Sequence, residues 1–104
     1  MKIMISQPMR GKTEEQIRNE RAEIVKQLEE DGYEVIDSIL DLEEGKSPIY
    51  YLSKSIELLD QADKIFFMNG WMNARGCRIE HRICKEYGKK TIYEDGYKKI
   101  KSIK

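Results

Sequence analysis

Glu80 is the first candidate for chemistry in this chain, because it lies where a ligand-binding carboxylate is expected. It falls near the end of the segment 69–81, which follows the apolar run 65–68 and leads into a predicted helix. Open α/β sheets place their ligands just past the carboxyl ends of their strands, and a helix N-terminus favours negative charge. We therefore expect Glu80 to be able to stay ionised at neutral pH, as a nucleophile or a hydroxyl-binding group requires.

The loop after the first predicted strand is a second candidate site, in this case for an anion. It consists of Ser6, Gln7, Pro8, Met9, Arg10, Gly11 and Lys12, and a predicted helix start follows it. Free backbone N–H groups at a helix start attract anions, Arg10 offers a bidentate grip on a phosphate, and Gly11 allows the backbone to come close. The spacing matches neither the P-loop nor the dinucleotide fingerprint, so an ordinary turn with a solvated arginine remains the alternative.

The elements that would position these two loops alternate between strand and helix. Apolar runs predict strands over 2–5, 33–36, 64–68 and 90–93. Helices are predicted after the capping box of Thr13 and Gln16, after Ser47 and Pro48, over about 76–87, and around Tyr97. The acidic segment 37–46 is expected to be a surface loop. This order predicts a small three-layer α/β sandwich whose parallel sheet has four or five strands in the order 2-1-3-4, flavodoxin- or Rossmann-like.

Composition limits the classes of function. The chain has 104 residues, which fits one domain over 1–104, and its 19 basic and 19 acidic residues leave no net charge. A neutral balance argues against nucleic acid or an acidic membrane as a partner. No apolar run is long enough to span a bilayer, no signal-peptide pattern is present, and the two cysteines lie seven residues apart on one predicted helix, too far for a disulfide. We expect a cytoplasmic protein.

Both candidate loops follow the carboxyl ends of parallel strands, so they lie at the same edge of the sheet. If the first and third strands are neighbours, the loops face one crevice, with phosphate-binding groups on one wall and a carboxylate on the other. A phosphorylated sugar fits such a crevice with Glu80 near its anomeric carbon. Trp71 and Met9 would cover a flat ring.

These residues carry a family resemblance. The motif consists of Gly70-Trp71, Arg75-Gly76 and Glu80-His81, to which Met9-Arg10-Gly11, Glu15-Gln16 and Gln61-Ala62-Asp63 can be added. The chain resembles the nucleoside 2-deoxyribosyltransferase superfamily over nearly its whole length, and most of all the short, phage-associated branch called domain of unknown function 4406. The resemblance implies that Glu80 is the nucleophile, and the first loop looks like the phosphate loop of 2'-deoxynucleoside 5'-phosphate N-hydrolases.

One residue departs from the family pattern. Catalytic members carry an aspartate on the second helix that assists substrate binding and proton transfer, and Ser55 stands at that position. The resemblance therefore implies an N-glycosidic-bond hydrolase or transferase acting on a (deoxy)nucleoside 5'-monophosphate. The alternative is a non-catalytic nucleotide-binding protein of the same fold, for example a phage protein that sequesters a signalling nucleotide.

The resemblance and the two loops together give the expected site. Its substrate-binding residues are Ser6, Gln7, Pro8, Met9, Arg10, Gly11, Asp63, Asn69, Gly70, Trp71, Arg75 and Gly76, with Glu80 as the catalytic residue. We expect no cofactor, a small-molecule nucleotide or nucleoside as ligand, and a homo-oligomer that covers the open side of a small sheet. Simpler interpretations stand beside this one: Trp71 as a packed aromatic, Asp63 as a turn cap and Arg75 as a surface ion-pair partner.

Three potential metal ligands share one helical stripe. Cys77, His81 and Cys84 are spaced by four and three residues. One helix rarely supplies a complete zinc site, and the sequence signals no fourth ligand. We therefore interpret the stripe as core packing and expect no metal.

Overall fold

The computed structural model describes residues 1–36 and 44–103, so most of the acidic segment 37–46 lies outside the described residues. The strands are β1 (Lys2–Ser6), β2 (Glu34–Ile36), β3 (Lys64–Phe67) and β4 (Lys90–Tyr93). The helices are α1 (Glu14–Glu30), α2 (Pro48–Gln61), α3 (Arg75–Tyr87) and α4 (Glu94–Ile103), with a short 3-10 helix, η1 (Trp71–Asn73), before α3. The sequence did not predict η1.

The strands form one parallel sheet in the order β2-β1-β3-β4, which confirms the predicted topology with four strands. Strand β1 lies at the centre, with Met4 paired to Ile36 of β2 and to Ile65 of β3. A helix lies between each pair of strands that follow one another along the chain, as parallel strands require, and the connection through α2 passes from β2 across β1 to β3. The fold is therefore a Rossmann- or flavodoxin-like α/β sandwich.

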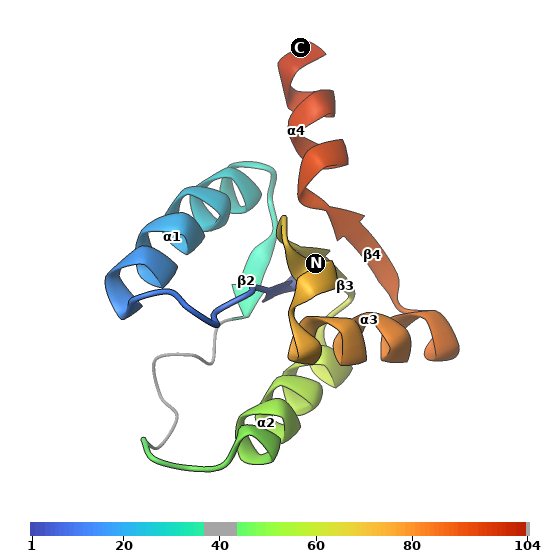
Figure 1. Cartoon of the computed structure of the whole chain (residues 1–104). Helices are drawn as coiled ribbons and strands as arrows, with labels where there is room; N and C mark the ends of the chain where they lie inside the picture. Colours follow the sequence, from blue (N-terminus) through green and yellow to red (C-terminus); the bar gives the residue numbers. More distant parts are fainter. Residues whose placement is uncertain (37–43, 104) are drawn as a thin grey trace.

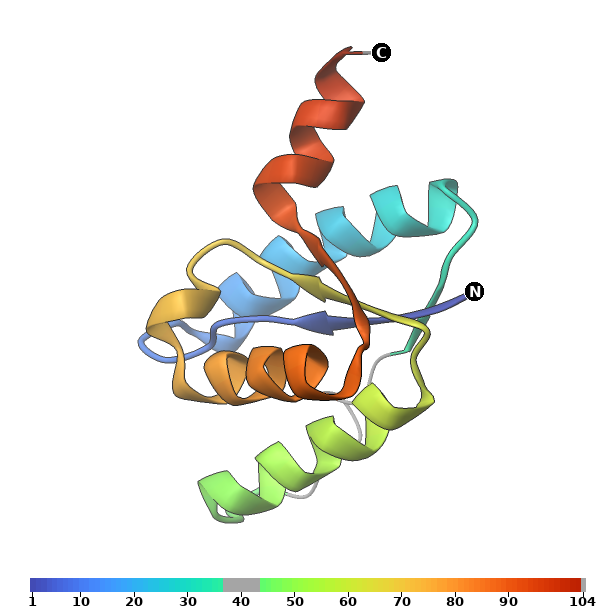
Figure 2. The ribbon, with the colours of Figure 1, turned by 90° about the vertical axis from the view of Figure 1, so that its right-hand side faces the viewer.

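Two helical layers cover the sheet, with α1 and α4 on one face and α2 and α3 on the other (Figures 1 and 2). Because side chains alternate along a strand, each face has its own apolar core. Ile3, Ile5 and Phe66 are buried against α1, while Met4 and Phe67 are buried on the side of α2 and α3. Beyond its first turns, α4 extends away from the body of the sandwich (Figure 2).

The helix ends follow the predicted signals. Thr13 forms a complete capping box with Gln16, in which the Thr13 side chain accepts from the Gln16 backbone N–H and the Gln16 side chain accepts from that of Thr13. Ser47 caps α2 ahead of Pro48. Gly88 ends α3 in the left-handed conformation, with φ of 72°. In the described part of the chain, no helix is long and apolar enough to cross a membrane.

The capping box can be tested by its contribution to stability. We expect Thr13→Ala to lower the free energy of unfolding by about 1 kcal/mol, because the Gln16 backbone N–H loses its partner. Urea denaturation followed by circular dichroism measures this value. Thr13→Ser keeps the hydroxyl and serves as the control. Equal stability of the Ala and Ser variants would show that the cap contributes nothing.

Candidate active site

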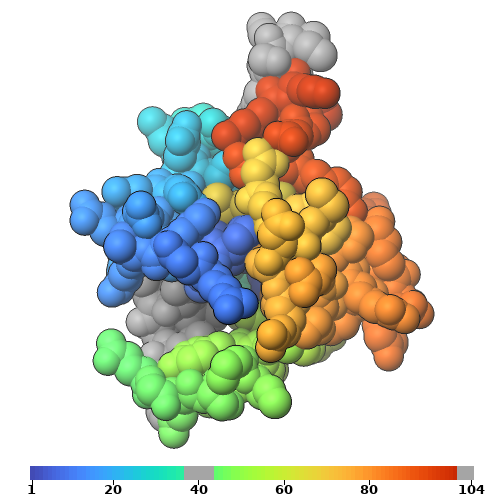
Figure 3. All heavy atoms as spheres, viewed as in Figure 1, coloured from blue at the N-terminus to red at the C-terminus, as the bar shows by residue number. Residues whose placement is uncertain are grey.

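The loops after β1 and β3 meet at the carboxyl edge of the sheet. The two strands are neighbours, and Ser6 pairs with Phe67 at their ends. Gly70 has φ of +90°, and a Cβ placed on it would lie 3.6 Å from Cγ of Pro8. In Figure 3 the blue segment that follows β1 lies against the yellow segment that follows β3. The two loops therefore lie side by side at this edge of the sheet, as the topology predicts.

Glu80 lies inside this junction and not on the surface of α3. Its side chain is 5% exposed, and the Ser6 hydroxyl donates a hydrogen bond of 2.9 Å to Oε1. Ser6 faces α3 because it lies on the same side of β1 as Met4. Glu80 reaches it from the second turn of α3, on the buried stripe that also holds Cys77 and Cys84. The hydrogen bond joins residues 74 positions apart in the chain.

A small cavity opens beside this hydrogen bond, with a volume of about 50 Å³. Its lining combines apolar and polar side chains: Met4, Ile5, Ser6, Gln7, Met9, Arg21, Ile36, Ser55, Leu58 and Glu80. Ser55 of α2 therefore lines the same cavity as Glu80. A serine there supplies a hydroxyl but no carboxylate.

Burial changes the electrostatics of Glu80. Loss of hydration raises the pKa of its carboxyl from 4.5 to about 7, and the hydrogen bond from Ser6 opposes this shift. Glu80 is therefore only partly ionised at neutral pH, and the predicted influence of the helix N-terminus does not keep its pKa at the ordinary value. Glu80 is the sixth residue of α3, beyond the first turn in which the helix dipole acts, and desolvation is the larger effect.

The neighbouring cysteines are poor nucleophiles. Burial raises the pKa of both the Cys77 and Cys84 thiols to about 11, and the charge of Glu80 adds to the shift. Ser6 opposes the shift of the Cys77 thiol, as it does that of Glu80. Both cysteines therefore remain protonated at neutral pH, the form in which a thiol is a poor nucleophile.

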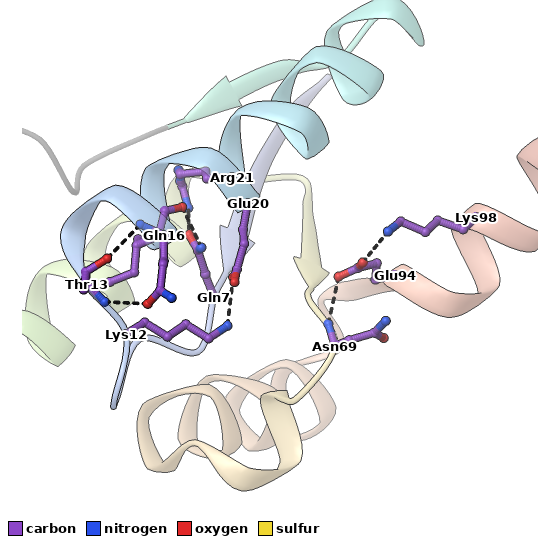
Figure 4. A network of polar contacts seen from close by, with 10 residues as sticks. Gln7, Lys12, Thr13, Gln16, Glu20, Arg21, Asn69, Glu94 and Lys98 are labelled. Carbon is purple, nitrogen blue, oxygen red and sulfur yellow. Dashed lines mark hydrogen bonds and ion pairs between the residues drawn. The ribbon is translucent and has the colours of Figure 1, made fainter.

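Gln7 and Arg21 form the second polar part of the cavity. The Gln7 amide donates from Nε2 to the Ile17 carbonyl at 2.9 Å, and Nη1 of Arg21 donates to Gln7 Oε1 at 3.5 Å (Figure 4). Gln7 is 6% exposed and Arg21 is 7% exposed. Arg21 was not among the expected site residues. It lies on the apolar stripe of α1 with Ile24 and Leu28, and a cation on such a stripe is the signal that could have identified it.

The rest of the first loop lies at the surface. Met9 lines the cavity but is 38% exposed, and the Lys12 backbone N–H closes a turn onto its carbonyl at 3.2 Å. Arg10 and Gly11, inside that turn, are exposed and do not line the cavity. Of the predicted phosphate loop, only Ser6, Gln7 and Met9 therefore reach the cavity, while Pro8 contacts the opposite loop.

The second loop is fixed by its neighbours. The Asn69 backbone N–H donates to Glu94 at 2.9 Å (Figure 4), and the Asn69 side chain donates to Asp95 at 2.9 Å. The Trp71 ring stacks on His81 with centroids 4.1 Å apart and packs on Phe67. Trp71 thus belongs to an aromatic cluster outside the cavity lining, in agreement with the packing interpretation.

Three further predicted residues do not reach the cavity. Asp63 lies before β3, at the opposite edge of the sheet, where its carboxylate accepts the Lys2 backbone N–H at 2.7 Å. Gly76 faces α2, with Leu52 Cδ1 4.0 Å from the position of an added Cβ. Arg75 is exposed at the first position of α3. Gly76 lies one turn before Glu80 on α3 without lining the cavity, whereas Asp63 is at the other edge of the sheet and Arg75 is exposed.

The potential metal ligands on α3 have other contacts. His81 Nε2 lies 2.6 Å from the Tyr93 hydroxyl, and burial together with the charge of Lys85 lowers the pKa of its ring. Cys84 belongs to the core on this face of the sheet. No group of three potential metal ligands is found within 1–36 and 44–103.

Comparison with protein families identifies the chain. Residues 1–93 match the family described as a domain of unknown function, DUF4406. The chain belongs to this family. The match covers every element except α4, so Glu80, Ser6, Ser55 and Arg21 all lie inside the DUF4406 domain. Comparisons with curated proteins and with solved structures gave no match.

The burial of Glu80 predicts an unusual dependence of stability on pH. Between its ordinary pKa of 4.5 and its folded value of about 7, the native state holds a proton that the unfolded state has lost, so stability falls as pH rises. The shift corresponds to about 3 kcal/mol lost between about pH 4 and pH 9. Glutamine does not titrate, so we expect the free energy of unfolding of Glu80→Gln, measured in urea, to rise relative to that of wild type as the pH increases. The difference between the two proteins should change by about 3 kcal/mol between about pH 4 and pH 9. Glu86→Gln, on the exposed face of the same helix, is the control; a difference between wild type and Glu80→Gln that stays constant with pH would contradict the shift.

The hydrogen bond from Ser6 can be tested separately. Because its hydroxyl stabilises the ionised carboxylate, we expect Ser6→Ala to raise the pKa of Glu80 above its wild-type value. Carbon-13 NMR of the labelled Glu80 carboxyl follows the titration directly. Ser53→Ala, on the exposed face of α2, should leave the titration unchanged. A lower or unaltered pKa in Ser6→Ala would show that the hydroxyl does not favour the charged form.

Proposed function

We propose that this DUF4406 protein cleaves or exchanges the N-glycosidic bond of a (deoxy)nucleoside 5'-monophosphate, with Glu80 as the nucleophile. The observation that carries the proposal is a buried carboxylate at the meeting point of two loops, held by Ser6 and lining a polar cavity. Proteins rarely bury a carboxylate without a use for it, because its desolvation costs stability. A family resemblance over most of the chain supports the same role for Glu80.

The proposed chemistry follows that of retaining glycosidases. Ionised Glu80 attacks the anomeric carbon through an oxocarbenium-like transition state, and the base departs. Water or a second base then releases the sugar from the enzyme. A carboxyl whose pKa is about 7 is a stronger base, and so a better nucleophile, than an ordinary glutamate once it has lost its proton.

The size of the cavity restricts how a nucleotide would bind. Its volume of about 50 Å³ is far below the roughly 300 Å³ of small-molecule pockets. The cavity would therefore take the reacting edge of the sugar, with the remainder of the ligand over the exposed loop that carries Met9 and Arg10. A second copy of the chain would cover such a ligand, and for this reason we keep a homo-oligomer in the proposal.

Ser55 favours a second candidate function. Among the described residues that line the cavity, Glu80 is the single carboxylate, so the pair of acids that glycosidases ordinarily use is incomplete there. A protein of the same fold that binds a nucleotide without cleaving it would need no second acid. Tight binding of a nucleotide that is recovered intact after denaturation would support this candidate.

Base release tests the proposal. We expect purified protein incubated with a panel of ribo- and deoxynucleoside 5'-monophosphates to release free base, detected by liquid chromatography. The value of kcat/KM should fall as pH drops below about 7, because protonated Glu80 is not a nucleophile. Glu80→Ala should abolish release, while Glu86→Ala on the same helix should retain it.

Mass spectrometry identifies the nucleophile in the same reaction. Acid quenching during turnover should leave a sugar phosphate on the peptide that contains Glu80. Base release that persists in Glu80→Ala, or an adduct on another residue, would remove Glu80 from the nucleophilic role.

A further inference from the structure

The two outer helix faces of the sandwich carry opposite charge, although the chain has no net charge. Helix α1 lies on one side of the sheet and α3 on the other (Figures 1 and 2). The exposed charged side chains of α3 are four cations and one acid, Arg75, Arg78, Arg82, Lys85 and Glu86. On α1, six exposed glutamates outnumber the exposed cations, Arg18 and Lys26. A neutral chain with this separation of charge attracts a second copy of itself, head to tail.

We propose that the outward stripe of α3 in one copy packs antiparallel on the outward stripe of α1 in a second copy. Both stripes have the spacing i, i+4, i+7 and i+11, so each lies opposite the buried side of its helix. Every side chain in them is exposed. The α3 stripe is Arg75, Ile79, Arg82 and Glu86, and the α1 stripe is Asn19, Glu23, Lys26 and Glu30. The inference assigns surfaces to a homo-oligomer and does not depend on the reaction proposed for Glu80.

Two ion pairs form when the stripes are aligned in this direction. Arg75 comes opposite Glu30, and Arg82 comes opposite Glu23. The two arginines are separated by the same number of residues as the two glutamates, about 10 Å along either helix, so both pairs form in one alignment. Arginine binds a carboxylate through two parallel hydrogen bonds. The antiparallel direction also places the start of α3 beside the end of α1, which suits the helix dipoles.

The remaining positions of the stripes are also compatible in this alignment. Ile79 comes opposite Lys26, whose aliphatic stem can cover it while the ammonium group stays in water. Glu86 comes opposite Asn19, whose side-chain amide can donate to the carboxylate. In the parallel direction Arg82 would instead face Lys26, a contact between like charges that disfavours that direction.

The partners that these side chains have within their own chain are weak competitors. Arg82 Nε lies 3.9 Å from Glu86 in an exposed pair, which contributes little to stability. Glu23 acts on the charge of Lys98 in α4, but Lys98 is paired with Glu94 at 2.7 Å. Arg82 and Glu23 can therefore exchange these contacts for one another.

The α3 face has the composition of a protein interface. Arg75, Arg78 and Arg82 are three of the six arginines of the chain. Met72 of η1, just before α3, is 66% exposed, and Nη1 of Arg78 donates to its carbonyl at 3.1 Å. Arginine and methionine are enriched at protein interfaces, whereas lysine is depleted there. This mixture of arginine and apolar side chains favours a protein partner.

Helix α4 gives a separate reason to expect a second copy on the α1 side. Figure 2 shows that α4 projects from the sandwich on the same side as α1. It has 10 residues, a length at which a helix in water depends on tertiary packing. Ile100 in its projecting part is 61% exposed. A second copy docked on α1 would lie beside α4 and give this side chain a surface to pack against.

Sedimentation velocity of the full wild-type chain tests the association itself. Because the contact joins two different faces, it can repeat from copy to copy, as a ring or an open chain. We expect the average mass to rise with protein concentration between about 10 μM and about 1 mM. The association constant should fall about tenfold between about 50 mM and about 500 mM salt, because salt screens exposed ion pairs. A monomer at every concentration, or association that salt does not weaken, overturns the proposal.

Exchange of charge between the stripes tests the pairing. One variant combines Arg75→Glu with Arg82→Glu, and the other combines Glu23→Arg with Glu30→Arg. Each variant alone should associate about 10²-fold more weakly than wild type, because like charges then meet at the contact. An equimolar mixture of the two should recover association, since each variant meets its complement on both of its faces.

A control variant separates the stripes from the total charge. Lys54→Glu with Lys90→Glu changes the net charge as much as the α3 variant does, but outside both stripes, and should associate like wild type. Association that persists in either stripe variant alone, or that does not recover on mixing, overturns the pairing. Circular dichroism checks that each variant is folded, and the salt dependence of wild type needs no variant.

Discussion

The parallel pairing of β1 with β3 is the constraint on which the site depends. It brings Ser6 opposite Phe67 at the carboxyl end of both strands, so that the two loops begin at the same level of the sheet. The alternation of side chains along β1 then turns Ser6 toward α3, where Glu80 meets it at 2.9 Å. A slip of one residue in this register would turn Ser6 toward α1 and leave the carboxylate without a donor.

The same arrangement conflicts with stability. Glu80 lies on the stripe of α3 that also buries Cys77 and Cys84 in an apolar setting. A leucine or methionine there would pack without desolvating a charge, whereas the carboxylate has one hydrogen-bond donor and a pKa of about 7. Local rules of packing are most often broken where a protein works. The buried Arg21 on the apolar stripe of α1 breaks the same rule, and both residues line one cavity.

Much of the fold could be predicted because local and topological rules are strong. The capping box at Thr13 and the stop at Gly88 are read from single residues, and the alternation of strands and helices leaves few possible sheet orders. The site was harder. Asp63 was included on the family resemblance, but it lies at the amino end of β3, opposite the cavity, and its carboxylate accepts the Lys2 backbone N–H. Arg10 was chosen for its type and position in a loop, and the turn that closes from Met9 to Lys12 leaves it exposed.

Arg21, which the sequence analysis did not include in the site, shows what a sequence pattern cannot predict. Arg21 comes from a helix interior, and its place at the cavity depends on the packing of α1 against β1, which no short motif encodes. Trp71 is the opposite case, because it was predicted to bind substrate and lies outside the cavity lining. Its ring packs on His81, Phe67 and Tyr93, a contact that forms only when α3 and β4 are assembled. Sequence patterns thus identified the edge of the sheet where the cavity lies, whereas three-dimensional packing decided which side chains enter it.

The two loops at the carboxyl edge of the sheet are held by different elements. On the β1 side, Gln7 is tied to α1 through the Ile17 carbonyl. On the β3 side, the Asn69 backbone N–H is bound by Glu94, which is 7% exposed and pairs with Lys98 at 2.7 Å. Glu94 and Lys98 belong to α4, which lies outside the residues matched to the family. The loop after β3 is thus held both from within the family domain, by the packing of Trp71 on His81 and Phe67, and by a hydrogen bond from α4 outside it.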